Sequence, residues 1–190
     1  MSQNNSQART VNTVDHGKLD VKALVLLAVL LAAGFILNFT VGKAISSVSG
    51  GMISPEFIIS AFCLTILVVR PNIPQALVIG LVSAAVIQIT TTSPFIDFAA
   101  EGLAAMLMAT FVGAGMRGAA KRNAGLAGVF TAITTFVSGV IFMVIKMALV
   151  GFTAELAGAM LPVIALTAVF NGVLVGALYL PIRAALKVTD

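Results

Sequence analysis

Long apolar stretches constrain this chain more than any other feature of its sequence. Six of them run along its 190 residues, at about 22–40, 55–70, 74–91, 96–116, 125–150 and 160–182. A helix that crosses a bilayer needs roughly 20 mostly apolar residues, because hydrocarbon offers no hydrogen bonds to an open backbone. The stretches lack the alternation of polar and apolar residues that a transmembrane barrel shows. The sequence therefore predicts an all-α integral membrane protein with six transmembrane helices.

The composition supports this fold class, because the chain carries too little charge to cover a soluble globule. It is 59% hydrophobic and only 9% charged, whereas a soluble domain carries about 25% charged residues. Residues 1–21 are polar, and we expect them to form a disordered tail before a single six-helix domain at 22–190. A cleaved signal peptide is the less favoured alternative, since the first apolar run is long and no clear cleavage motif follows it.

Basic residues fall almost entirely on one side of the predicted membrane. Nine of the 11 lie there: Arg9, Lys18, Lys22, Arg70, Arg117, Lys121, Arg122, Arg183 and Lys187. Basic segments stay on the cytoplasmic side during insertion, so we expect cytoplasmic N- and C-termini in a multi-pass protein of a prokaryotic plasma membrane. The net charge of +4 has the same explanation. The basic residues are scattered over short loops, so lipid rather than nucleic acid is the expected partner.

Polar and charged side chains gather at the opposite, outer ends of the predicted helices. Together with Asn171, near the middle of the last predicted helix, they give nine candidates for substrate binding: Asn38, Glu56, Gln88, Thr91, Thr92, Asp97, Glu101, Lys146 and Asn171. An ionised group at the centre of a membrane helix costs roughly 2.5–3.5 kcal/mol, so several such groups near one depth need an explanation. We expect an outward-opening cavity for a small aromatic or zwitterionic molecule. Five phenylalanines are candidates for its wall: Phe35, Phe39, Phe57, Phe95 and Phe98.

Each of these charged residues also has an ordinary structural explanation. Asp97 can complement the positive end of its helix, Lys146 can extend to the membrane interface, and Glu56 is a favourable first-turn acid. Asn171 can bond across helices. Glu101 is the hardest to explain in this way because it lies a full turn deeper than Asp97. It either accepts a bond from a ligand or pairs with Lys146.

No catalytic, metal or cofactor site is predicted. A GxGxxG pattern at residues 113–118 falls at the end of a predicted membrane helix, whereas a nucleotide-binding pattern of this kind lies between a strand and a helix. Cys63 is the only cysteine, so there is no paired-cysteine metal motif. We therefore expect a protein that is not an enzyme and that contains no machinery for hydrolysing nucleotides.

Small residues four apart mark the first predicted helix at Ala28 and Ala32. Such pairs let helices approach closely in lipid, where van der Waals packing replaces the hydrophobic driving force. Packing inside the bundle is the ordinary explanation. The alternative is a smooth stripe that docks onto a partner membrane protein.

With these features, the chain resembles the substrate-binding (S) components of energy-coupling-factor transporters. Residues 52–108 resemble the tryptophan-transporter branch most, chiefly through the turn Thr-Thr-Thr-Ser-Pro at residues 90–94 and the acid-bearing helix start after it. Glycines follow the turn in that branch, whereas this chain continues with Phe95, Ile96 and Asp97.

The resemblance implies a subunit that captures a small molecule, such as tryptophan or a vitamin, from outside the cell. It also implies a transmembrane coupling subunit and cytoplasmic ATPases that tilt the subunit in the membrane, with the Ala28 stripe as the docking surface. Two alternatives remain open from the residues themselves. One is a self-sufficient carrier coupled to protons or ions through Glu101 and Lys146, and the other is an assembly subunit without a ligand.

Overall fold

The computed structural model describes residues 21–48, 50, 55–89, 91 and 93–186, and the regular structure of these residues is entirely helical. Seven α-helices follow one another: α1 (Val21–Leu37), α2 (Lys43–Val48), α3 (Phe57–Val69), α4 (Ile73–Ile87), α5 (Ile96–Gly115), α6 (Ala124–Val150) and α7 (Ala154–Ala185). A π-helical turn, η1 (Asn38–Gly42), joins α1 to α2 without a break, and a 3-10 helix, η2 (Gly118–Arg122), precedes α6. The predicted all-α class is confirmed. The predicted tail lies outside the described residues except for Val21, which is already helical.

Four helical segments in the described part of the chain are long and apolar enough to cross a membrane. They are Val21–Val48, Ile96–Gly115, Ala124–Val150 and Ala154–Ala185. The other two of the six predicted spans correspond to α3 and α4, which are shorter apolar helices of 13 and 15 residues. Each of the six predicted stretches therefore corresponds to an apolar helical segment, and α3 and α4 are shorter than the other four.

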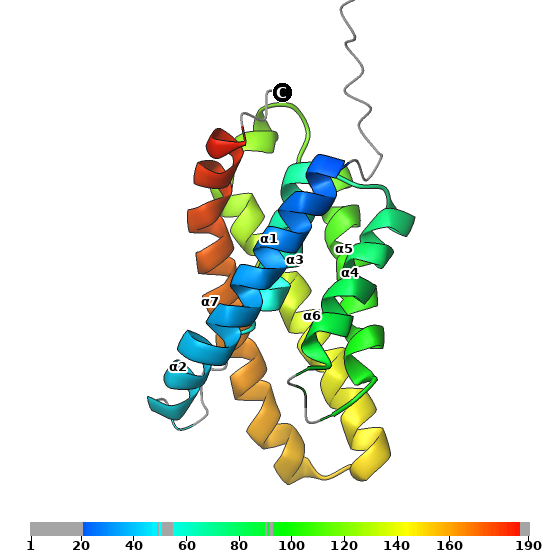
Figure 1. Cartoon of the computed structure of the whole chain (residues 1–190). Helices are drawn as coiled ribbons and strands as arrows, with labels where there is room; N and C mark the ends of the chain where they lie inside the picture. Colours follow the sequence, from blue (N-terminus) through cyan, green and yellow to red (C-terminus); the bar gives the residue numbers. More distant parts are fainter. Residues whose placement is uncertain (1–20, 49, 51–54, 90, 92, 187–190) are drawn as a thin grey trace, which may run out of the picture.

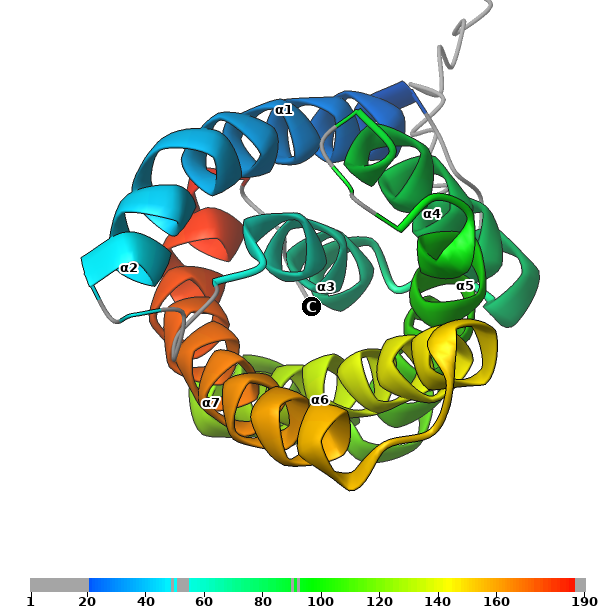
Figure 2. The same ribbon diagram turned by 90° about the horizontal axis from the view of Figure 1, so that it is seen from below.

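Helix α3 is short because protein rather than lipid surrounds it. It lies inside a ring formed by α1, α4, α5, α6 and α7 when the bundle is viewed along its axis (Figure 2), and every residue from Phe57 to Val68 is buried. Thirteen residues give a helix of roughly 20 Å, against a hydrocarbon core of about 30 Å. A helix enclosed by other helices does not have to be as long as the hydrocarbon core is thick. An apolar run in the sequence does not show whether protein or lipid will surround the helix.

Two predicted loops are helical. The Gly/Ser-rich segment after the first span continues as η1 and α2 up to Val48. Gly42 in this segment is buried, and an added Cβ there would lie 3.4 Å from the Pro55 carbonyl oxygen. Glu155, which falls between the last two predicted stretches, lies in the first turn of α7, and Thr153 caps this helix. The Leu156 amide donates to the Thr153 hydroxyl oxygen at 3.2 Å, and an acid in the first turn suits the helix dipole.

Glycines set two of the close helix crossings. At Gly172 in α7, an added Cβ would lie 2.8 Å from the Gly128 carbonyl oxygen of α6. At Gly80 in α4, an added Cβ would lie 2.5 Å from the carbonyl oxygen of Glu101 and 2.8 Å from the Cβ of Ala105. Gly80 therefore fixes the distance between α4 and the turn of α5 that carries Glu101.

We predict that Gly80→Ala destabilises the protein, because the methyl group has no room between two backbones. Overpacking of this kind typically costs about 1–3 kcal/mol, and thermal unfolding in detergent followed by circular dichroism will measure it. Gly158→Ala is the matched control, since Gly158 also lies within a helix but has nothing within 4 Å of an added Cβ. Equal melting temperatures for the two variants would contradict the close α4–α5 crossing.

Candidate ligand-binding site

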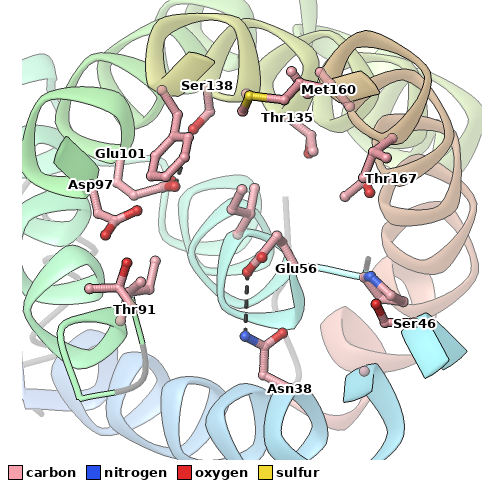
Figure 3. A pocket seen from close by; sticks show the side chains of 18 of the residues that line it. Asn38, Ser46, Glu56, Thr91, Asp97, Glu101, Thr135, Ser138, Met160 and Thr167 are labelled. Atoms are coloured by element: carbon pink, nitrogen blue, oxygen red, sulfur yellow. Dashed lines mark hydrogen bonds between the residues drawn. The ribbon is translucent and has the colours of Figure 1, made fainter. Parts of the chain in front are cut away.

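A cavity of about 440 Å³ lies at the end of the bundle where α6 passes into α7, at the bottom of Figure 1. Residues of η1, α2, α5, α6 and α7 and the ends of α3 and α4 surround it. Its polar lining consists of Asn38, Lys43, Ser46, Glu56, Thr91, Asp97, Glu101, Thr135, Ser138, Lys146 and Thr167. The exposed residues Phe39 and Lys43 mark its rim, and the buried residues Glu101 and Ser138 mark its floor. Figure 3 shows that the polar side chains it labels, such as Glu56, Asp97 and Glu101, surround one space.

The structure brings six of the nine predicted substrate-binding residues to this cavity: Asn38, Glu56, Thr91, Asp97, Glu101 and Lys146. Gln88 and Asn171 lie behind the lining and bond to residues in it or beside it. Thr92 lies outside the described residues. Residues that are far apart in the sequence thus share one cavity, and their role in binding remains a prediction.

Asn38 and Asn171 hold Glu56 at the start of α3. The Asn38 amide donates to the Glu56 carboxylate at 3.3 Å, and its carbonyl oxygen accepts from the Phe57 amide at 3.1 Å. The Asn171 amide, fully buried in α7, donates to the main-chain oxygen of Glu56 at 3.2 Å. Glu56 is therefore fixed from η1 on one side and from α7 on the other.

Gln88 orients Asp97 at the start of α5. Its amide nitrogen donates to the Asp97 carboxylate at 3.2 Å, and its carbonyl oxygen accepts from the Phe95 amide at 2.9 Å. The Thr91 hydroxyl also bonds to Asp97. Gln88 was predicted to line the cavity. It lies behind the lining instead and affects the cavity by orienting Asp97.

Glu101 carries an unsatisfied carboxylate oxygen at the cavity floor. The side chain is only 4% exposed, and its Oε1 accepts from the Ser138 hydroxyl of α6 at 3.1 Å. Its Oε2 is buried and has no hydrogen-bond partner among the described residues. A buried polar atom without a partner costs roughly 1–3 kcal/mol. A ligand that donates a hydrogen bond or brings a positive charge would remove this cost.

Carboxyl groups and ammonium groups occupy different levels of the cavity. Glu56, Asp97 and Glu101 lie close enough to repel one another. Lys146 lies over the ring of Phe142, with 5.7 Å between its nitrogen and the ring centroid. It follows Ser138 by eight residues on α6, which places it roughly 12 Å further along the helix.

Of the two alternatives that the sequence left open for Glu101, the pairing with Lys146 is not seen in the structure. No ion pair joins these two residues, both of which the structure describes. The sequence places both near outer helix ends, but Glu101 reaches Ser138 at the floor, whereas Lys146 stays nearer the mouth. The site therefore separates negative from positive groups.

Sequence reasoning missed the hydroxyl groups that α6 contributes. Thr131, Thr134, Thr135 and Ser138 are all buried and lie on one face at spacings of three and four residues. This polar stripe in an otherwise apolar helix is a signal that could have found Thr135 and Ser138. Short hydroxyl side chains are easily overlooked because they commonly bond to their own helix, as Thr131 does to the Ala127 carbonyl at 2.9 Å.

Aromatic residues were predicted less well than polar ones. Of the five phenylalanines proposed for the wall, Phe39 lines the cavity, whereas Phe57 packs edge-on against Phe170 with centroids 5.9 Å apart and Phe95 is 76% exposed. Phe142 lines the cavity and was not predicted. Within the described residues, no group of three or more His, Cys, Asp or Glu side chains is placed to hold a metal ion.

Comparison with known proteins gives one match. A family model described as "Tryptophan transporter TrpP" matches residues 20–187. No curated protein and no solved structure matches the chain. The matched range includes every described helix of the bundle, from α1 to α7, and all residues that line the cavity.

We predict that Glu101→Gln stabilises the protein in the absence of ligand. The substitution keeps an acceptor for Ser138 but removes a buried acidic group that lies near two others, which is the trade-off expected where a site is built for binding rather than for stability. A gain of 1 kcal/mol raises the Tm by roughly 2–4 °C in a chain of this size. Glu155→Gln is the control, because Glu155 is exposed and lies outside the cavity lining. A lower Tm for Glu101→Gln than for the control would show that the carboxylate is structural.

Proposed function

The chain belongs to the tryptophan transporter TrpP family, and on that premise we propose that it is the solute-binding subunit of an energy-coupling-factor importer. Membership makes it a membrane solute transporter, and it confirms the resemblance to the tryptophan-transporter branch found in the sequence. The proposed ligand is tryptophan or another small zwitterionic aromatic molecule. The proposed location is the plasma membrane of a prokaryotic cell, with the cavity facing outwards.

The observation that carries this proposal is the unsatisfied carboxylate oxygen of Glu101 at the floor of a mixed-charge cavity. An ammonium group fits among Glu101, Asp97 and Glu56 because it donates to carboxylates and offsets their repulsion. A ligand carboxylate fits towards Lys146 or Lys43, nearer the rim. The cavity volume of about 440 Å³ falls within the range of roughly 300–1,000 Å³ that small-molecule sites occupy.

Apolar side chains support an aromatic ligand. Phe142, Met160 and Ile164 line one side of the cavity, and Ile59 and Ile87 line another. An indole or similar ring placed among them buries apolar surface, and a thioether makes favourable contacts with aromatic rings. Selectivity in this arrangement comes from the separation of the charged floor and rim by an apolar middle.

The energy for transport comes, in this proposal, from a transmembrane coupling subunit and cytoplasmic ATPases. Ala28 and Ala32 are exposed, whereas Leu27 and Leu31 on the same helix are buried towards the bundle. Packing inside the bundle therefore does not account for the two alanines. Small exposed side chains on a membrane helix let a partner helix approach closely, so this stripe is the proposed docking surface.

We predict that the purified protein binds tryptophan and that Glu101→Ala weakens binding at least tenfold, which is a loss of about 1.4 kcal/mol. The substitution removes the acceptor that the ammonium group would use. Isothermal calorimetry in detergent gives the affinities, and Glu155→Ala is the control because Glu155 lies outside the cavity lining. Unchanged affinity would remove Glu101 from the site. Failure to bind any amino acid or aromatic vitamin would favour an assembly subunit without a ligand.

We also predict that replacing both Ala28 and Ala32 by Leu spares tryptophan binding but abolishes uptake in cells. Bulky side chains would hold the partner helix away without reaching the cavity. The control replaces Ala165 and Ala177, which are exposed on α7, by Leu and should leave uptake unchanged. Persistent uptake by the Ala28/Ala32 variant would contradict the docking surface. Uptake by proteoliposomes that contain this chain alone and a proton gradient would favour a self-sufficient carrier.

A further inference from the structure

A second cavity, of about 160 Å³, lies at the opposite end of the bundle, where α3 and α5 end and η2 begins. In Figure 1 this end is at the top, away from the ligand-binding cavity. Three basic residues line it, Arg70, Arg117 and Lys121, and no acidic residue does among those the structure describes. It shares no lining residue with the first cavity. It is therefore a separate cavity from the one proposed to bind the transported molecule.

Arg70 brings one buried and unsatisfied guanidinium nitrogen to this cavity. It follows the last residue of α3 in the left-handed conformation, with φ of 55°, a place that glycine usually takes. Its Nη1 donates to the Met116 carbonyl oxygen at 2.8 Å. Its Nη2 is buried and has no hydrogen-bond partner in the described part of the chain. A buried charged donor that lacks a partner is costly, and an anion is the group that best satisfies it.

Arg117 and Lys121 are held beside Arg70 by bonds that leave their charged ends available. Arg117 donates from Nε to the Gly113 carbonyl oxygen at 2.8 Å, which leaves the two terminal nitrogens of its guanidinium. The main-chain oxygen of Lys121 accepts from the fully buried Tyr179 hydroxyl at 2.6 Å and from Arg183 at 3.3 Å. These two bonds anchor η2 to α7, so Lys121 stays at the cavity.

Capping of α5 explains only part of this arrangement. Cations near a helix C-terminus are favourable, and Arg70 and Arg117 each satisfy one carbonyl oxygen there. One nitrogen of each guanidinium is enough for this purpose. The remaining donors, together with Lys121, place three positive charges around one small cavity without a lining acid to offset them.

We propose that this cavity binds a phosphate group, from the headgroup of an anionic lipid or from free phosphate. Planar guanidinium groups match phosphate oxygens in pairs. The cavity is about half the size of the smallest typical cavities for drug-sized ligands, which begin near 300 Å³, so it suits a compact anion. Basic pockets between membrane helices on the cytoplasmic side are known to take lipid headgroups, and the basic residues predict that this end faces the cytoplasm.

The test compares two sources of phosphate on the purified full-length protein. One arm measures the Tm in nanodiscs of phosphatidylcholine with and without phosphatidylglycerol. The other arm measures the Tm in neutral detergent with inorganic phosphate, against chloride at equal ionic strength. Binding to the folded state raises the Tm. A rise with phosphatidylglycerol alone assigns the cavity to a lipid headgroup, and a rise with inorganic phosphate as well assigns it to a phosphate group from either source. No rise in either arm would overturn the proposal.

Substitutions locate the effect. We expect Arg117→Gln and Lys121→Gln each to reduce the Tm rise by at least half and to weaken phosphatidylglycerol binding, measured by native mass spectrometry, at least fivefold. Both residues are partly or fully exposed to solvent, so these variants should fold even if Arg70→Gln does not. Lys22→Gln is the control, because Lys22 is an exposed cation at the start of α1 that does not line the cavity. If all three variants lost the same share of the Tm rise and of phosphatidylglycerol binding, the effect would come from diffuse surface charge. That result would contradict a specific site.

Discussion

Enclosure of α3 by the other helices is the constraint on which the rest of this structure depends. The helix is roughly 10 Å shorter than the hydrocarbon core of a bilayer, so its two ends lie within the protein rather than at the membrane surface. The residues that bracket it are Glu56 at its start and Arg70 at its end. Each lines one of the two cavities. A short central helix in a ring of longer ones leaves space at both ends, and the charges that flank it determine what each space can hold.

The charges of Glu56 and Arg70 both suit the ends of α3 at which they lie. An acid at the start of α3 and a cation at its end both complement the helix dipole, so neither is placed against local electrostatics. The helix dipole does not explain the further charged groups of the same sign that surround each of these two residues. Asp97 and Glu101 add further negative groups near Glu56, whereas Arg117 and Lys121 add positive groups near Arg70. Stability alone favours opposite charges at each end, and like charges gathered around a cavity are the arrangement expected of a site that waits for a counter-charge.

The sequence was sufficient for the helical class, the six apolar segments and most of the acids around the cavity, because hydropathy and charge position carry that information directly. It was insufficient wherever a residue's role depends on which face of its helix it occupies or on which neighbours surround that helix. The apolar run of α3 reads the same whether lipid or protein surrounds it. Lys146 and Glu101 both lie near outer helix ends, yet they are separated because α6 extends well beyond its contact with α5 at Ser138. In the sequence, Arg70 indicated only which side of the membrane is cytoplasmic. Its unsatisfied guanidinium nitrogen could not be predicted, because it depends on where Met116 lies in the folded protein.

Helix α1 and the η1 turn that continues it connect the proposed docking surface to the proposed ligand site. Gly34 lets it approach α3 so closely that an added Cβ would lie 3.0 Å from the Phe57 carbonyl oxygen. One turn later, Asn38 bonds to both Glu56 and Phe57. Ala32 lies six residues before Asn38, or roughly 9 Å along the helix, on an exposed face. A ligand that draws the Glu56 carboxylate away from Asn38 therefore acts on the helix that presents the alanine stripe, and no chain of intervening side chains is needed to link capture with docking.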